Sequence, residues 1–187
     1  MDILVRKPTE GEIEDMKSKP VWRCGGMNIA IIYASKYGTT EKVAASIAEK
    51  LTGKNEVELF SLKNNPFPDI SRFEMIILGS SIYAGQASKK IKAFCKINEP
   101  LLLQKRIGLF VCGMHIDKEE REKELKLAYS EALHEKSEAS CFLGGEFLFE
   151  KMNFFERLII KKIAKTTKTV HRIDWDAIVD FAEKLKI

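Results

Sequence analysis

The sequence predicts an α/β protein, a three-layer sandwich in which a five-stranded parallel sheet carries helices on both faces. Two observations lead to this fold class. Short, β-branched apolar runs alternate with longer segments of helical periodicity along most of the chain, and strands that alternate with helices pair in parallel. Because crossovers between parallel strands are right-handed, few arrangements remain, and we expect the order 2-1-3-4-5. That order places a ligand-binding crevice at the carboxyl ends of the first and third strands.

The expected elements follow one another in strand–helix order. The strands are expected at residues 29–33, 56–60, 75–79, 107–113 and 140–149, the last with a double glycine inside it. The helices are expected at residues 39–51, 87–97, 118–136, 153–166 and 174–186. The run IAIIY at 29–33 is typical of a strand buried on both faces. Asp174 is placed to cap the last helix. The inner face of that helix is expected to consist of Trp175, Ile178, Val179, Ala182 and Leu185.

Length and composition indicate one globular domain with an added segment. The chain has 187 residues, of which 45% are hydrophobic and 31% charged. Residues 27–187 form the expected domain, and the polar residues 1–26, with Pro8 and Pro20, are interpreted as an accessory tail and linker. No apolar run has the length of a membrane span, and the N-terminus has no signal core, so we expect a cytoplasmic protein.

Cysteine and histidine spacing gives no sign of a disulfide framework or a metal site. Cys24, Cys95, Cys112 and Cys141 lack paired spacing. His115, His134 and His171 lack the spacing of metal ligands. We therefore expect reduced thiols and no metal.

The loop after the first strand, SKYGTT at 35–40, runs directly into a helix. Amide N–H groups and the helix dipole make such a position an anion site, and Gly38 lets the backbone approach a ligand closely. Ser35, Thr39 and Thr40 add hydroxyl groups. The loop matches neither the Walker nor the dinucleotide-binding pattern. The residues themselves leave two interpretations open, a phosphate site or an ordinary turn capped by Thr39 or Thr40.

Two further loops follow the third and fourth strands at the same predicted edge of the sheet. GSSIYAGQAS at 79–88 offers small residues and the aromatic face of Tyr83, whose simpler role would be surface packing. CGMHID at 112–117 again has a glycine at the turn. Together the three loops suit a phosphorylated, planar ring. A reactive thiolate–imidazole pair of Cys112 and His115 is the less favoured interpretation of the third loop.

The segment IIYASKYGTTEKVAASIAEKL resembles the first strand, phosphate loop and first helix of flavodoxins, whose loop pattern is [ST]-x-[TY]-G-x-T. The resemblance implies a flavodoxin-like sandwich that binds FMN, with the chemistry borne by the flavin and no catalytic side chain. It implies phosphate contacts from Ser35, Lys36, Tyr37, Gly38, Thr39 and Thr40. It implies ring contacts from Ser80, Ser81, Ile82, Tyr83, Ala84, Gly85, Cys112, Gly113, Met114 and His115.

One branch of the family is more similar than the others. GSSIYAGQASKKIKAF and the C-terminal FFERLIIKKIAKTTKTVHRIDWDAIVDFAEKL resemble the menaquinone-dependent protoporphyrinogen oxidases. That branch has an arginine and then an aromatic residue where this chain has Tyr83 and Ala84. Three functions stay open: an electron-transfer flavoprotein serving a redox partner protein or a quinone, a protoporphyrinogen IX oxidase of haem biosynthesis, and a flavodoxin-fold binding protein without a redox role.

A basic segment accounts for the excess positive charge. Residues 151–172 hold seven Lys or Arg and one acid, Glu156, in a chain of net charge +4. On the helix expected at 153–166, one arc carries Phe154, Arg157, Leu158, Lys161, Lys162 and Lys165. Cations with embedded apolar residues suit an anionic membrane surface or a flat apolar partner edged with carboxylates, such as a porphyrinogen. We therefore expect peripheral contact with the inner face of the cell membrane or with such a partner. Nucleic acid is not expected, because no reading motif is present.

Overall fold

The structure is a computed structural model that describes residues 26–147, 150 and 169–186. Its parallel strands are β1 (Asn28–Ala34), β2 (Glu56–Ser61), β3 (Met75–Tyr83), β5 (Arg106–Cys112) and β6 (Ser137–Phe142). They pair in the order β2-β1-β3-β5-β6, which in chain order is the predicted 2-1-3-4-5. A short β4 (Gln86–Ala87) pairs antiparallel with the end of β3. The predicted fold class is confirmed.

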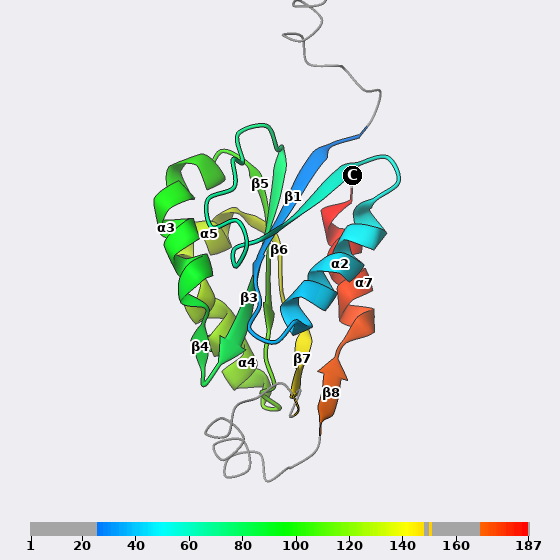
Figure 1. Ribbon diagram of the computed structural model, residues 1–187, viewed down its shortest axis with the longest axis vertical. Coiled ribbons are helices and arrows are strands. Elements are labelled where there is room, and N and C mark those ends of the chain that lie inside the picture. Colours follow the sequence, from blue (N-terminus) through cyan, green and yellow to red (C-terminus); the bar gives the residue numbers. More distant parts are fainter. Residues whose placement is uncertain (1–25, 148–149, 151–168, 187) are drawn as a thin grey trace, which may run out of the picture.

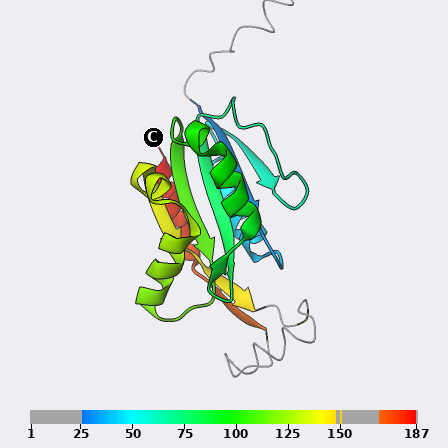
Figure 2. The ribbon, with the colours of Figure 1, turned by 90° about the vertical axis from the view of Figure 1, so that its left-hand side faces the viewer.

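Helices cover both faces of the sheet (Figures 1 and 2). One face carries α2 (Thr39–Leu51) and α7 (Trp175–Leu185), and the other carries α3 (Lys89–Leu102), α4 (Lys118–Ala128) and α5 (Glu131–Lys136). Each face has its own core. Ile31 and Ile77 pack with Phe181 on the first face, whereas Ile76 packs with Phe94 on the second. The central strands β1, β3 and β5 are therefore buried on both sides, as their apolar runs predict, whereas the edge strands β2 and β6 are partly exposed.

The last helix differs from its prediction on one edge. Asp174 caps it as expected, because its carboxylate accepts a hydrogen bond from the Ala177 amide at 2.9 Å. Trp175 and Val179, however, are 48% and 39% exposed, and Phe181 is buried instead. The buried stripe begins at Ile178 and continues at i+3, i+4 and i+7, which leaves Val179 outside it. Trp175 lies on the first turn, where the Lys42 ammonium approaches its ring.

The helix expected at 118–136 is broken into α4 and α5. Tyr129 has an extended backbone between them, and its buried hydroxyl lies 2.9 Å and 2.7 Å from the carbonyl oxygens of Leu78 and Phe110. Ser130 then caps α5 by accepting a hydrogen bond from the Leu133 amide. Anchoring the Tyr129 ring between β3 and β5 is incompatible with a straight helix through this position.

The strand expected at 140–149 is also divided. β6 ends at Phe142, and β7 (Gly144–Phe147) leaves the sheet to pair antiparallel with β8 (Val170–Ile173). We call this two-stranded unit the β7–β8 ribbon. Gly144 has φ +71°, and a Cβ there would lie 1.9 Å from the Arg172 carbonyl oxygen. Only glycine fits this bend, so the double glycine marks a change of direction and not a strand interior.

Two predicted segments fall largely or wholly outside the described residues. These are the accessory tail, apart from Gly26, and the basic helix with Phe154, Arg157, Leu158, Lys161, Lys162 and Lys165. Within the described part of the chain, no helix combines the length and apolarity needed to cross a membrane.

Candidate functional site

A cavity of about 1070 Å³ lies at the carboxyl edge of the sheet, the lower edge in Figure 1, where the three predicted loops meet. The predicted residues that line it are Ser35, Lys36, Tyr37, Thr39, Thr40, Ser81, Ile82, Tyr83, Ala84, Gly85, Cys112, Gly113, Met114 and His115. The sequence therefore located the cavity, and the binding roles of these residues stay predictions.

Two predicted residues shape the cavity without lining it. Gly38 precedes α2 with φ 102°, and its amide donates to the Ser35 hydroxyl at 2.9 Å. Ser80 is fully buried, and its hydroxyl accepts a hydrogen bond from the Ser88 amide at 3.0 Å. Both hydrogen bonds close the turn of their own loop. Gly38 and Ser80 therefore act on loop geometry in this structure.

The start of α2 has the properties of an anion site. Its cap residue is Gly38, which has no side chain, so neither Thr39 nor Thr40 caps the helix and its first amide groups stay open. This contradicts the interpretation as an ordinary capped turn. The Thr40 hydroxyl is completely buried and makes no well-formed hydrogen bond among the described residues, where the thiol of Cys112 is a weak polar neighbour. A buried hydroxyl without a partner is costly, and a phosphate oxygen would satisfy it.

The aromatic side of the cavity is built from two loops. Tyr37 and Tyr83 meet edge to face, with ring centroids 6.4 Å apart. The Lys36 ammonium lies 3.3 Å from the centroid of the Tyr83 ring. Beyond Tyr83 the chain turns through Ala84 and Gly85, which both have positive φ. Tyr83 thus presents an aromatic surface with a cation on one face, which the sequence did not indicate.

Sequence reasoning missed the α4 and β7–β8 walls of the cavity. The lining residues on these walls are Glu120, Lys123, Glu124, Leu127, Gly145, Glu146, Phe147, Val170 and Arg172, whereas Gln86, Ile116 and Asp117 also line the cavity but belong to the predicted loops. The ribbon pairs segments that are far apart in sequence, and the double glycine was the one sequence feature that indicated an irregularity there. Burial of Glu124 on α4 was also not predicted, since the charged residues of this helix suit a solvated face.

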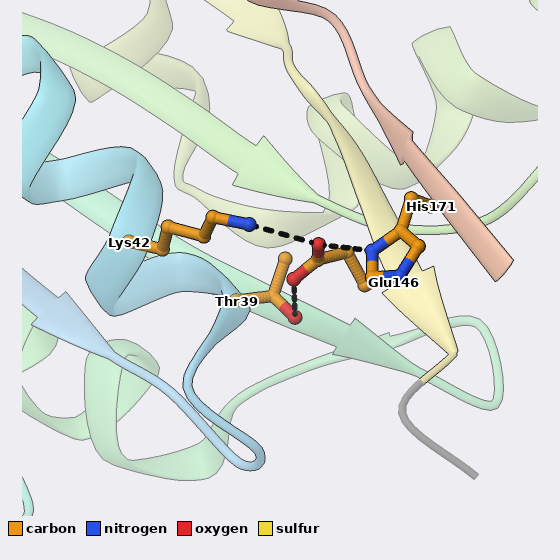
Figure 3. Close-up of polar contacts among 4 residues, drawn as sticks. All are labelled: Thr39, Lys42, Glu146 and His171. Carbon is orange, nitrogen blue, oxygen red and sulfur yellow. Dashed lines mark hydrogen bonds and ion pairs between the residues drawn. The ribbon is translucent and has the colours of Figure 1, made fainter. Parts of the chain in front are cut away.

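Glu146, on β7, forms a polar cluster with the first turn of α2 (Figure 3). Its carboxylate accepts hydrogen bonds from the Lys42 ammonium at 3.1 Å and the Thr39 hydroxyl at 3.5 Å, and His171 Nδ1 lies 2.6 Å away. The side chain is only 4% exposed. Burial acts to raise the pKa of Glu146, but His171 and Lys42 lower it below its ordinary value overall. Glu146 is therefore a buried carboxylate at neutral pH.

Glu124, on α4, is a second buried acid, and its pKa is shifted in the opposite direction to that of Glu146. Its Oε2 atom has no hydrogen-bond partner in the described part of the chain. Burial raises the pKa of Glu124, His115 opposes that rise, and Glu120 adds to it. A Cβ on Gly113 would lie 3.2 Å from Oε2, so the third loop passes close above this oxygen. The cavity therefore contains an unsatisfied acceptor at its α4 wall.

The thiol chemistry considered for the third loop is not supported. Cys112 is buried, and burial raises the pKa of its thiol to about 12. His115 is exposed. A neutral thiol is a poor nucleophile. Among the described residues, no group of His, Cys, Asp and Glu side chains could hold a metal ion.

Comparison with known proteins agrees with this architecture. The protoporphyrinogen IX dehydrogenase [quinone] of Leishmania major is 24% identical over 165 residues, which span 81% of this chain and 71% of that protein. The flavodoxin of Fusobacterium nucleatum, solved with flavin mononucleotide, superposes with a TM-score of 0.53 at 17% identity, covering 85% of this chain and 96% of that one. A short-chain flavodoxin associated with a bacterial microcompartment superposes with a TM-score of 0.52 at 15% identity, with the same coverages.

The family comparison covers most of the chain. The family described as the flavodoxin domain matches residues 30–174, which extend from β1 to the cap of α7. This segment contains all three predicted loops and both strands of the ribbon. The family predicted from the loop pattern is therefore confirmed, and the chain belongs to the flavodoxin domain family.

Proposed function

We propose that this protein is an FMN-binding oxidoreductase that transfers electrons through its bound flavin. The observation that carries the proposal is the buried Thr40 hydroxyl, which makes no well-formed hydrogen bond among the described residues, beside the uncapped start of α2. It lies in a loop of flavodoxin pattern, in a chain of the flavodoxin domain family. The F. nucleatum flavodoxin of the same fold was solved with FMN.

The residues present fit the two chemical halves of FMN. The open amides of α2, with the hydroxyls of Ser35 and Thr40, would hold the phosphate. Tyr83 and the close-packed loop at Gly113 would flank the ring. When bound, a flavin supplies one- and two-electron redox chemistry. The chain's own task is to bind, orient and shield the cofactor from water.

The first test is the visible spectrum of the purified protein, with the released cofactor identified. A flavin spectrum and FMN on release would support the proposal. A colourless protein that FMN cannot reconstitute would contradict it and favour the binding protein without a redox role. Titration of the apoprotein with FMN then gives the affinity.

A second candidate is quinone-linked oxidation of protoporphyrinogen IX. Ile116 and Leu127 are 70% and 56% exposed at the cavity, an apolar rim suited to a flat apolar substrate or a quinone. The cavity volume, about 1070 Å³, lies at the upper end of the range of about 300–1,000 Å³ that is usual for small-ligand pockets. The L. major relative carries this activity in its name. Tyr83 and Ala84, in place of arginine and an aromatic residue, favour the plain carrier.

An oxidation assay separates the two candidates. The FMN-loaded protein is given protoporphyrinogen IX and a menaquinone analogue, and porphyrin fluorescence is followed. Turnover supports the oxidase. No turnover by a protein with bound FMN leaves the electron carrier.

Peripheral membrane contact through the basic segment is also part of the proposal. Its charge is the supporting observation. Co-sedimentation with anionic vesicles tests it, and binding should weaken as salt screens the charges. Absence of binding at low salt would contradict membrane contact and leave a redox partner protein as the remaining expectation.

A further inference from the structure

The β7–β8 ribbon places a negative charge at the end of the cavity that is built for an anion. Glu146 Oε2 lies 3.5 Å from the hydroxyl of Thr39, one of the phosphate contacts that the resemblance to flavodoxins implies. The carboxylate reaches the first turn of α2 from a strand more than a hundred residues further along the chain (Figure 3). The protein therefore already supplies this helix end with an anion of its own.

The same carboxylate engages the nearest cation of α2. Lys42 lies on the first turn of the helix and pairs with Glu146 Oε1 at 3.1 Å. A lysine paired in this way contributes less attraction to an incoming phosphate. Because Glu146 is only 4% exposed, water screens its charge weakly. A phosphate entering this end therefore meets an ion pair without net charge, in place of a lysine whose charge is fully available to it.

We infer that Glu146 is a specificity-determining residue that disfavours phosphate-bearing ligands relative to neutral ligands with the same ring. FMN affinity is then set by competition between an internal carboxylate and the ligand phosphate for the start of α2. This inference rests on the proposed FMN function and concerns the same cavity. It differs from a purely supporting role, in which Glu146 would only hold the ribbon against α2.

The test compares FMN with riboflavin, which has the same ring without the phosphate. Affinities are measured by quenching of flavin fluorescence in the wild type and in Glu146→Gln. The variant removes the charge, while its side-chain carbonyl can still accept a hydrogen bond from Lys42. We expect FMN to bind about tenfold more tightly to the variant, on the scale of one screened charge pair, with riboflavin unchanged. Glu49→Gln removes an exposed carboxylate from the same helix and should change neither affinity.

Lys42→Gln is the reciprocal variant and keeps the inference testable if Glu146→Gln fails to fold. It leaves the Glu146 charge less compensated, so FMN should bind about tenfold more weakly while riboflavin is unchanged. Equal changes for both flavins in either variant, or weaker FMN binding by Glu146→Gln, would overturn the inference in favour of structural support.

The same titrations distinguish this inference from the proposed function. A wild type that binds FMN, with a ratio of FMN to riboflavin affinity that neither variant changes, overturns only the role of Glu146. FMN binding that appears only in Glu146→Gln supports it. If neither the wild type nor the variants bind FMN, both proposals are overturned.

Discussion

Two glutamates, Glu146 on β7 and Glu124 on α4, line the same cavity and have opposite electrostatic states. Glu146 has three polar neighbours, and the net effect of its surroundings lowers its pKa. Glu124 has an oxygen without a partner among the described residues, and burial raises its pKa. One carboxyl is stabilised as an anion, and the other is pushed toward its neutral form.

The two glutamates differ in what surrounds them. Near Glu146 lie the open amides and hydroxyls at the start of α2, so this carboxylate and a ligand phosphate would compete for the same helix end. Near Glu124 lie the close-packed loop at Gly113 and the exposed apolar side chains of Ile116 and Leu127. We call the first surroundings the phosphate end of the cavity and the second the ring end.

The largest effect is expected from Gly144→Ala, which disrupts the bend that delivers Glu146 to α2. The new Cβ would combine positive φ with a contact 1.9 Å from the Arg172 carbonyl oxygen. We expect a loss of about 3 kcal/mol in unfolding free energy, measured by urea denaturation. Gly85→Ala is the matched control, because Gly85 also has φ +71° but open space around it, and its strain alone should cost about 1 kcal/mol. Equal losses of unfolding free energy in the two variants would show that the close contact with the Arg172 carbonyl oxygen does not contribute.

Thr40→Val tests the phosphate end directly. The substitution keeps the shape of a buried side chain and removes a hydroxyl that lacks a partner. Without ligand, stability should be unchanged or higher, because an unsatisfied polar group is lost. FMN affinity should fall by about 2 kcal/mol, the value of a hydrogen bond to a charged group, while riboflavin affinity is kept. A parallel loss of stability and of both affinities would contradict the assigned role.

The phosphate loop and the parallel sheet could be predicted from the sequence, whereas the burial and contacts of the two glutamates could not. The loop at 35–40 is readable because it is local: strand, hydroxyl-rich turn and helix follow one another within a few residues. The parallel sheet is readable because its strands are short apolar runs between helices. In both cases the residues that define the element are neighbours in sequence, so the local pattern predicts the structure.

Glu146 and Glu124 were not readable, for two separate reasons. The ribbon pairs Glu146 with His171 across a long connection, and no local pattern encodes such a pairing. Glu124 lies in the charged sequence KEEREKELKLA, where one inward acid cannot be distinguished from its solvated neighbours. Tyr129 likewise breaks a helix through contacts with β3 and β5, which are tertiary.

Glu124→Gln tests the ring end through the pH dependence of stability. The folded-state pKa is raised, so the stability that the protonated acid provides is complete below the unfolded-state pKa and is lost as pH rises through the folded-state value. The variant should lack this loss and exceed the wild type by about 1 kcal/mol at neutral pH. His115 lowers and Glu120 raises the pKa of this carboxyl, so His115→Gln serves as a control for the contribution of His115.

Glu146→Gln should show the opposite sign in the same unfolding measurement. Its lowered pKa means that the carboxylate stabilises the fold above the unfolded-state pKa, and that this contribution is lost as pH falls through the folded-state value. The variant should therefore be less stable than the wild type at neutral pH and match it in acid. Shifts of the same sign for both glutamates would remove the distinction between the two ends.

The smallest effect is expected from Lys36→Met, which connects the two halves of the ligand. Lys36 belongs to the phosphate loop in sequence, yet its ammonium lies 3.3 Å from the centroid of the Tyr83 ring. If it orients Tyr83 for the ring, its loss should weaken FMN and riboflavin equally, by about 0.5–1 kcal/mol, the usual value of a cation–π contact. If it instead serves the phosphate, only FMN should bind more weakly. Lys36→Arg keeps the cation and should restore both affinities under the first interpretation. Comparing the FMN and riboflavin affinities of these variants therefore shows whether Lys36 acts on the ring or on the phosphate.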